Sequence, residues 1–438
     1  MANGYEALER QVEERGIRFI QLWFTDLLGR PKNVEIPAGE LGRALEDGIG
    51  FDGSSIHGFA RIDESDMVLR PDPGTFAVFP WDGVARLVCD VTRPDGAPYE
   101  GDPRFALKRA VARAAEHGLT LNVGTELEYF YSRSDHAVEM LDSAGYFDLA
   151  PADRSSDLRR ETVLAIEAMG IHVEAAHHEV APSQEEIDLR HCEALRMADQ
   201  LMACRFVIKE VARQNGVHAT FMPKPLYGQN GSGMHTHMSL SDVDGRNLFF
   251  SADGELHLSD LARGFLAGIM MHAREVTGVC AQWVNSFKRL VPGYEAPVYI
   301  TWSSCNRSNM VRVPMYQPGR EGASRIEFRA PDSACNPYLT FAVLLHAGLE
   351  GIDKQYEIPA PVEEDLFAMD DAERDALGIE TLPGSLNEAI AAMQESALVR
   401  NALGDHIFEK FIENKRIEWD GYRAQVHQYE LDRYLPVL

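Results

Sequence analysis

Hydrophobic and polar residues alternate with a period of two along three segments of the chain, residues 124–131, 233–240 and 324–330. This alternation predicts β-strands that turn successive side chains to opposite faces. In each predicted strand the ionisable residues share one face, and the other face carries Leu127, Met234, Thr236, Ile326 and Phe328. Any one of these strands, taken alone, is explained by an ordinary sheet with a solvated polar face.

The first hundred residues favour short strands. Residues 5–15 predict an amphipathic helix, residues 17–24 a strand, and the stretch ending at Ile36 a second strand after a Gly-Arg-Pro turn. Residues 75–100 contain further apolar runs broken by Pro and Gly. Because Gly101-Asp102-Pro103 interrupts this pattern, we predict a small N-terminal domain over 1–101 and a catalytic domain over 102–438.

The remainder of the chain mixes helical and strand-like patterns, so the predicted fold class is α+β. Helical periodicity and suitable stop residues predict helices over residues 104–117, 156–169, 192–214, 256–272 and 337–351.

Composition and charge narrow the function. The chain has 438 residues, 45% of them hydrophobic, and a formal net charge of −26. Such an acidic protein repels nucleic acids and anionic membranes, so neither is an expected partner. The N-terminus has no apolar signal segment, and the six cysteines show no metal-binding spacing. We therefore expect a reduced, cytoplasmic protein.

Acidic residues in the predicted strands indicate a metal site. The strand pairs contribute Glu126 with Glu128 and His235 with His237, and residues 177–188 add Glu179 and Glu186 around a Pro-Ser turn. Glu327 brings the number of glutamates to five. Five glutamates and one histidine suit a pair of hard cations, Mg²⁺ or Mn²⁺. So many carboxylates would repel one another strongly without cations.

Arginines form a second group. Five of them lie within 41 residues in a region rich in Pro and Gly, namely Arg289, Arg307, Arg312, Arg325 and Arg329. Each alone is explained by a surface ion pair, but together they favour binding of carboxylate or phosphate groups. No Walker loop and no dinucleotide-binding glycine motif is present, so neither chemistry is predicted.

The ordered motifs themselves resemble a family. GFDGSSIHGFARIDESD, GTELEYF, HHEVAPSQEEID, PKPLYGQNGSGMHTHMSL, NSFKRLVPGYEAP, NRSNMVRVP and RIEFR are similar to type I glutamine synthetase, and the resemblance runs nearly end to end. It implies a β-grasp N-terminal domain and a catalytic domain with a curved antiparallel sheet. It also implies a dodecamer of two stacked hexameric rings, with each active site between two subunits.

The resemblance assigns roles by motif position. The metals, two or three Mg²⁺ or Mn²⁺ per site, would bind Glu128, Glu179 and Glu186 on one side and Glu126, His235 and Glu327 on the other. Glutamate and the transferred phosphate would bind Asn230, Gly231, Arg289, Arg307, Arg329 and Glu295. The ATP side would hold His237, Ser239, Arg312 and Arg325.

The same resemblance implies how ammonium is used. Asp52 of an adjacent subunit would attract ammonium and accept its proton, near Tyr146, while Glu295 would lie on a mobile flap. The γ-carboxylate of glutamate is a poor electrophile, so ATP would first convert it to γ-glutamyl phosphate, which must be shielded from water.

Two alternatives stay open at this point. An organic amine such as a polyamine or ethanolamine could replace ammonium, although Asp52 argues for ammonium. His57 and the stretch from Tyr316 depart from the family pattern, and these departures leave the choice of amine and the regulation open. A catalytically silent assembly would lose metal or arginine positions, and none is lost.

Phe367, where one subclass has a modifiable tyrosine, predicts no adenylylation, and Arg61 matches a feedback-inhibition position.

Overall fold

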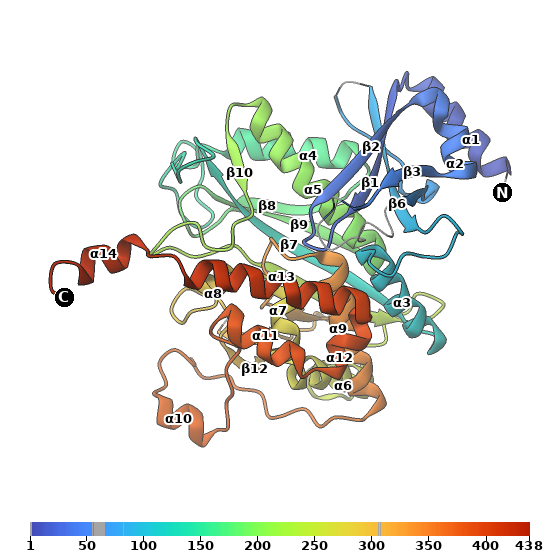
Figure 1. Ribbon diagram of the computed structural model, residues 1–438. Coiled ribbons are helices and arrows are strands. Elements are labelled where there is room, and N and C mark those ends of the chain that lie inside the picture. The colour runs from blue at the N-terminus through green and yellow to red at the C-terminus, as the bar shows by residue number, and fades with distance from the viewer. Residues whose placement is uncertain (1, 55, 57–65, 82, 305, 307) are drawn as a thin grey trace.

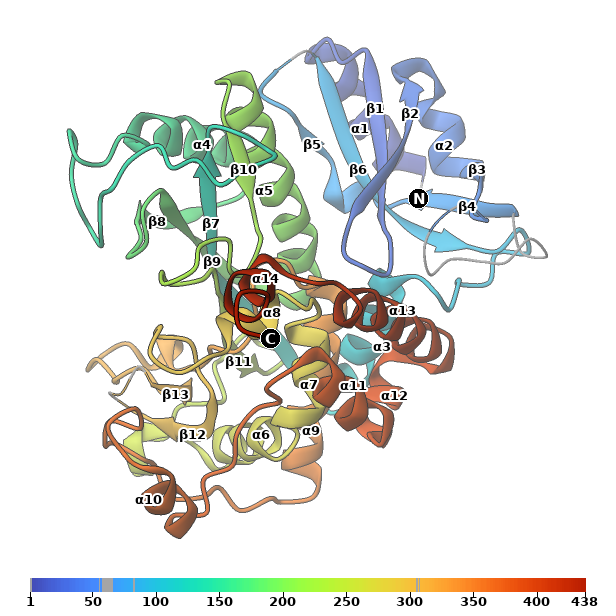
Figure 2. The same ribbon diagram turned by 60° about the vertical axis from the view of Figure 1, so that its left-hand side comes forward.

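The computed structural model describes residues 2–54, 56, 66–81, 83–304, 306 and 308–438. A small N-terminal sheet lies beside a larger body of sheet and helices (Figures 1 and 2), and the C-terminal segment projects away from that body in Figure 1. In the described ranges, no helix combines the length and the apolar character needed to cross a membrane.

The N-terminal sheet has six strands in the order β2-β1-β6-β4-β3, with β5 also paired to β6. The β1–β6 pair is parallel and the others are antiparallel. Apolar residues of two helices, such as Leu8 and Leu41, pack on Ile20 and Leu22 of the sheet. The bounds are α1 (Ala2–Glu14), β1 (Phe19–Thr25), β2 (Pro31–Pro37), α2 (Leu41–Asp47), β3 (Ile49–Asp52), β4 (Asp66–Pro71), β5 (Ala77–Val78) and β6 (Val84–Thr92).

The second sheet has eight strands in the order β12-β13-β14-β11-β7-β9-β8, with β10 paired to β7. Every pairing is antiparallel except β12–β13. The bounds are β7 (Thr120–Ser132), β8 (Val173–His178), β9 (Gln184–Glu193), β10 (His218–Thr220), β11 (Met234–Ser241), β12 (Tyr299–Ser303), β13 (Asn309–Arg312) and β14 (Ile326–Phe328).

Helices cover the second sheet and build the main core. Their bounds are α3 (Pro103–Glu116), α4 (Ser156–Ala168), α5 (Ala194–Gln214), α6 (Asp260–Met271), α7 (Ala273–Cys280), α8 (Ser286–Arg289), α9 (Pro337–Asp353), α10 (Asp371–Ala376), α11 (Leu386–Gln394), α12 (Ala397–Leu403), α13 (Asp405–Arg423) and α14 (Gln428–Tyr434). Helices α6 and α9 approach backbone to backbone, because a Cβ on Gly268 would lie 2.0 Å from the carbonyl oxygen of Ala347.

One buried arginine ties the two parts together. Arg104 of α3 donates to Asp199 of α5 through Nε and Nη2. Its Nη2 also lies 2.8 Å from Asp72, the residue after β4, and its Nη1 lies 2.5 Å from Asp90 of β6. Asn336 adds hydrogen bonds to the carbonyl oxygens of the β1–β2 turn. Breaking a buried network of this kind leaves charges unpaired, so it fixes the N-terminal sheet against the helices.

The α+β prediction is confirmed, and most predicted elements lie within one or two residues of their observed bounds. The helix predicted over 256–272 is wrong at its start. Residues 255–257 form a short 3₁₀ turn in which Leu256 and His257 have positive φ values, and α6 begins at Asp260 after the N-cap Ser259. A hydroxyl side chain that accepts from the helix N–H groups starts the helix more strongly than apolar periodicity does.

Candidate functional site

Strand register brings the predicted metal ligands together. In the sheet order β14-β11-β7-β9, His235 lies directly opposite Glu126, and His237 lies opposite Glu327. Glu128, which lies on β7 with Glu126, pairs with Glu186 of the neighbouring strand β9. Directly opposed residues have Cβ atoms about 5 Å apart, so the ionisable side chains meet on one face of the sheet.

The other face of these strands is apolar, as the alternation predicts. The intervening side chains are all fully buried in the main core: Leu127, Met234, Thr236, Ile326 and Phe328. A one-residue slip would move charged groups into that core, and the cost of such a slip fixes the register.

The ionisable face forms the floor of a cavity of about 250 Å³. One wall is acidic, and an adjoining wall carries arginines. The acidic wall consists of Glu126, Glu128, Glu179, Glu186 and Asp188 with His177 and His235, and the other consists of Arg289, Arg312 and Arg329. Cations would bind on the first wall, and anions would bind between those cations and the second wall.

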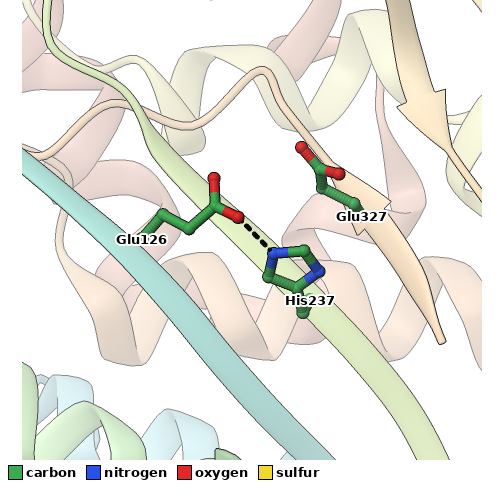
Figure 3. A group of neighbouring side chains, drawn as sticks. All are labelled: Glu126, His237 and Glu327. Atoms are coloured by element: carbon green, nitrogen blue, oxygen red, sulfur yellow. Dashed lines mark hydrogen bonds and ion pairs between the residues drawn. The ribbon is translucent and has the colours of Figure 1, made fainter. Parts of the chain in front are cut away.

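Two histidines converge on the carboxylate of Glu126, and Figure 3 shows one of them, His237, together with Glu327. Glu126 Oε2 lies 2.7 Å from Nδ1 of His235, and Glu126 Oε1 lies 2.7 Å from Nε2 of His237. Candidate ligand atoms of Glu126, His237 and Glu327 all lie within 4.8 Å of one another. The prediction grouped His235 with Glu126 and Glu327 and placed His237 toward the nucleotide; the structure brings both histidines to this cluster.

A second cluster lies further along the acidic wall. Candidate ligand atoms of His177, Glu186 and Asp188 lie within 4.8 Å of one another, and Nδ1 of His177 is 3.8 Å from Oε1 of Glu179. His177 and Asp188 were missed by the sequence analysis. The rule that found Glu126 and Glu128 would have found Asp188, because it lies two residues after Glu186 on the same strand.

A tight turn carries Glu179 to the cavity. Buried Asp142 accepts a hydrogen bond from the main-chain N–H of Ser183, which has a φ of 56°, and its carboxylate lies 3.2 Å from Nε2 of His178. Burial alone would lower the pKa of His178, but the hydrogen bond to Asp142 outweighs it and raises the pKa to about 9. The turn is therefore held by a buried ion pair at its base.

Gln184 is a further residue that the sequence analysis missed. Its side-chain amide donates to Glu128 Oε2 at 3.0 Å and to the carbonyl oxygen of Gly231 at 3.1 Å. Glu128 Oε2 also accepts from the main-chain N–H of Gly233 at 2.9 Å. These donors fix the carboxylate and leave its other oxygen directed at the cavity.

The pKa shifts on the acidic wall indicate that it holds more carboxylates than can ionise together without cations. Burial, followed by the charges of Glu128 and Glu126, raises the pKa of Glu186. Burial also raises the pKa values of Glu128 and Glu179 to about 7. Burial would raise the pKa of Glu126 as well, but hydrogen bonds from the two histidines lower it. Buried carboxylates that cannot all ionise together are the donor set that hard divalent cations require, so the site fits Mg²⁺ or Mn²⁺.

The arginine wall is organised around Glu327. Nε of Arg312 lies 2.5 Å from Glu327 Oε2, and Nη1 of Arg329 lies 2.8 Å from Glu327 Oε1. Arg289 is 2% exposed and donates to the main-chain carbonyl oxygens of residues 329–331. The guanidinium groups are therefore held rigidly before any ligand binds.

A loop closes one side of the cavity. The side-chain amide of Asn230 donates to Glu295 Oε2 at 3.0 Å, and Arg329 donates to the Glu295 carbonyl oxygen at 3.4 Å. Gly231 lies too close to the Pro223 carbonyl oxygen for a side chain, since a Cβ there would approach within 2.3 Å. Tyr146 lines the rim.

The predicted nucleotide residues line neighbouring cavities. His237, Ser239 and Arg325 face a cavity of about 390 Å³ that shares Glu126 with the central one. Arg312 and Arg325 also line a cavity of about 320 Å³. The 320 Å³ cavity shares Arg312 with the central cavity and Arg325 with the 390 Å³ cavity.

Asp52 does not reach the cavity of its own chain; the resemblance gives it a role in the site of an adjacent subunit. Asp52 ends β3, which lies on the opposite side of the molecule from β8 in Figure 2. Its carboxylate accepts from the Ser54 N–H at 2.9 Å, and hydrogen bonds from Ser54 lower its pKa. Arg307 and Arg61 lie outside the described residues.

Models of two protein families match the chain. The glutamine synthetase β-grasp domain matches residues 16–94, and the glutamine synthetase catalytic domain matches residues 100–434. The chain therefore has the fold of that class, a β-grasp domain followed by a catalytic domain with a curved sheet and helices.

Whole-chain relatives agree with this assignment. The chain is 51% identical over 440 residues to a glutamine synthetase of Mycolicibacterium smegmatis and 50% identical over 438 residues to that of Thermotoga maritima, covering 98% of this chain and at least 98% of each relative. Among solved structures, the GmaS/ADP complex superposes with a TM-score of 0.90 at 34% identity, covering 98% of this chain and 99% of the other. This chain belongs to the glutamine synthetase family.

Proposed function

We propose that the protein ligates ammonium to the γ-carboxylate of L-glutamate at the expense of ATP and forms glutamine, ADP and phosphate through γ-glutamyl phosphate. The observation that carries this glutamate–ammonia ligase activity is the meeting of an acidic and an arginine wall in one cavity. Anionic glutamate must approach anionic ATP, and this arrangement neutralises both reactants.

Two or three Mg²⁺ or Mn²⁺ ions would be held by the acidic wall. Glu128, Glu179 and Glu186 would hold one of them, joined by His177 and Asp188. Another would be held by Glu126, Glu327 and a histidine from the His235–His237 pair. When bound, these ions neutralise phosphate charge and draw electron density from the transferred phosphoryl group.

The protein's own groups orient the reactants. Arg329 and Arg289, with Arg307, would hold the glutamate carboxylates and the phosphoryl group, and Asn230 with the Gly231 main chain would hold the amino acid. ATP would lie along His237, Ser239, Arg312 and Arg325. Because Glu327 already fixes two of these arginines, little reorganisation accompanies phosphoryl transfer.

Asp52 would act in the site of a neighbouring subunit. It is exposed and ends β3, which lies across the molecule from β8 in Figure 2, and hydrogen bonds from Ser54 lower its pKa. An ionised carboxylate attracts ammonium and accepts its proton before attack, near Tyr146 and Glu295. This role requires an oligomer with shared sites, proposed as two stacked hexameric rings in the cytoplasm.

We also place the chain in the subclass that is not adenylylated. Phe367, in the Asp365-Leu366-Phe367 sequence, has no hydroxyl group, and its ring centroid lies 6.1 Å from that of Tyr299. Feedback by glutamine would act through Arg61. Unchanged glutamine sensitivity in Arg61→Ala would refute that role.

The test is ATP-dependent phosphate release with Mg²⁺, glutamate and ammonium, repeated with putrescine and with ethanolamine. The proposal expects turnover with ammonium that is lost in Glu327→Ala and in Asp52→Ala. Turnover only with an organic amine would make the protein a γ-glutamyl amine ligase. No turnover with any amine would favour a structural assembly.

A further inference from the structure

Lys224 is a buried ammonium group without a carboxylate partner. Its Nζ lies 3.6 Å from the ring centroid of Tyr294 and donates a hydrogen bond to the carbonyl oxygen of Gln229. In the described part of the chain, no salt bridge joins Lys224 to an acidic residue. Burial, followed by repulsion from Arg289, lowers the pKa of Lys224 to about 8.

The position of Lys224 is fixed through its main chain. Its N–H donates to Asn285 Oδ1 at 2.7 Å, and Asn285 Nδ2 donates back to the Lys224 carbonyl oxygen at 3.1 Å. This two-bond bracket ties the loop before the Asn230 region to the segment just before α8. The main chain is held by this bracket and the ammonium group by its hydrogen bond to Gln229, so the charge stays against the ring of Tyr294.

The segment that carries Tyr294 has little else to hold it. Among the described residues, no backbone–backbone hydrogen bond begins or ends at residues 292–297. Gly293 has a φ of 90° and Glu295 a φ of 58°. The end of the segment is anchored, because Ala296 is buried in the main core. Residues 292–295 make two further hydrogen bonds, those of Glu295 with Asn230 and Arg329. With so few contacts, residues 292–295 open at low free-energy cost.

We propose that Lys224 is a positioning residue that latches this flap, residues 292–295, over the cavity by holding the face of the Tyr294 ring. The inference rests on the proposed function for its purpose, which is to keep water from an acyl phosphate. With the latch in place, Tyr294, Glu295 and Ala296 line the cavity as a wall. Without it, the flap keeps only the Glu295 contacts and opens more often.

Cleavage of the full-length protein after Glu295 by a glutamate-specific protease tests the latch without requiring catalysis, because the flap must open to enter the protease. Tyr294→Ala and Lys224→Met should each raise the rate of cleavage at Glu295 by about 30-fold, the equilibrium shift expected for loss of a desolvated cation–π contact. Tyr294→Phe keeps the ring and should be cleaved at this site like the wild type. Lys354→Met is the matched control, because Lys354 lies 5.9 Å from the Tyr356 ring on a different surface.

The activity assay then separates the latch from the proposed function. In the wild type we expect phosphate and glutamine in equal amounts, and in Tyr294→Ala we expect phosphate in excess, because the acyl phosphate is hydrolysed. Unchanged cleavage at Glu295 in Tyr294→Ala and Lys224→Met, or equal cleavage in Tyr294→Phe and Tyr294→Ala, would overturn the latch. Faster cleavage in Tyr294→Ala and Lys224→Met, in a protein with no ammonium-dependent turnover, would support the latch and refute the function.

Discussion

His346 makes the stability of the fold depend on pH. It lies on α9, where it is 8% exposed, and its Nδ1 is 3.1 Å from Nη1 of Arg113 on α3. Burial, followed by repulsion from Arg113 and Arg109, lowers its pKa from 6.5 to about 4. The folded protein therefore keeps this imidazole neutral at a pH where the unfolded chain protonates it.

The sign and size of the effect follow from this difference. Above pH 6.5 the histidine is neutral in both states and contributes no pH dependence. As the pH falls below 6.5, only the unfolded state gains a proton, so the folded state loses about 1.4 kcal/mol per pH unit until the folded pKa is reached. Between pH 7.5 and pH 5 the loss amounts to about 2 kcal/mol.

His346→Gln removes this titration and keeps an acceptor for Arg113. Urea unfolding at fixed protein concentration, in EDTA, should show that the wild type loses about 2 kcal/mol more than the variant between pH 7.5 and pH 5. His117→Gln is the control, because His117 is exposed at the end of α3. A wild-type minus His346→Gln difference that stays constant with pH would refute the reasoning.

Three further predictions concern the site and its support. Glu327→Gln removes a charge shared by the metal cluster and two arginines, so Mn²⁺ affinity, measured by calorimetry, should fall at least about 10-fold; unchanged affinity would exclude Glu327 as a ligand. Gln184→Leu deprives Glu128 of a donor and should weaken Mn²⁺ binding by about 10- to 100-fold while Gln214→Leu, at an exposed position, leaves it unchanged. Arg104→Met leaves Asp199 without its partner and should lower the free energy of unfolding by about 3–5 kcal/mol in urea titrations; a loss below about 1 kcal/mol would contradict the role given to this network.

Local pattern alone predicted much of the site. Alternation of period two placed Glu126 with Glu128 and His235 with His237 on shared strand faces, because the pleat of a strand requires it. The same pattern predicted the buried partners on the opposite face, and the register confirms them. These conclusions needed no knowledge of which strands are neighbours.

Tertiary structure decided which of these faces meet. The order β14-β11-β7-β9 brings together strands separated by up to about 200 residues, and it puts His237 beside Glu126 as well as His235. Pairing order depends on packing of the whole core and on loop closure, neither of which is encoded in a short segment. The sequence therefore determined the donor groups and their faces, whereas the fold determined which donors share one cavity and left Asp52 outside it.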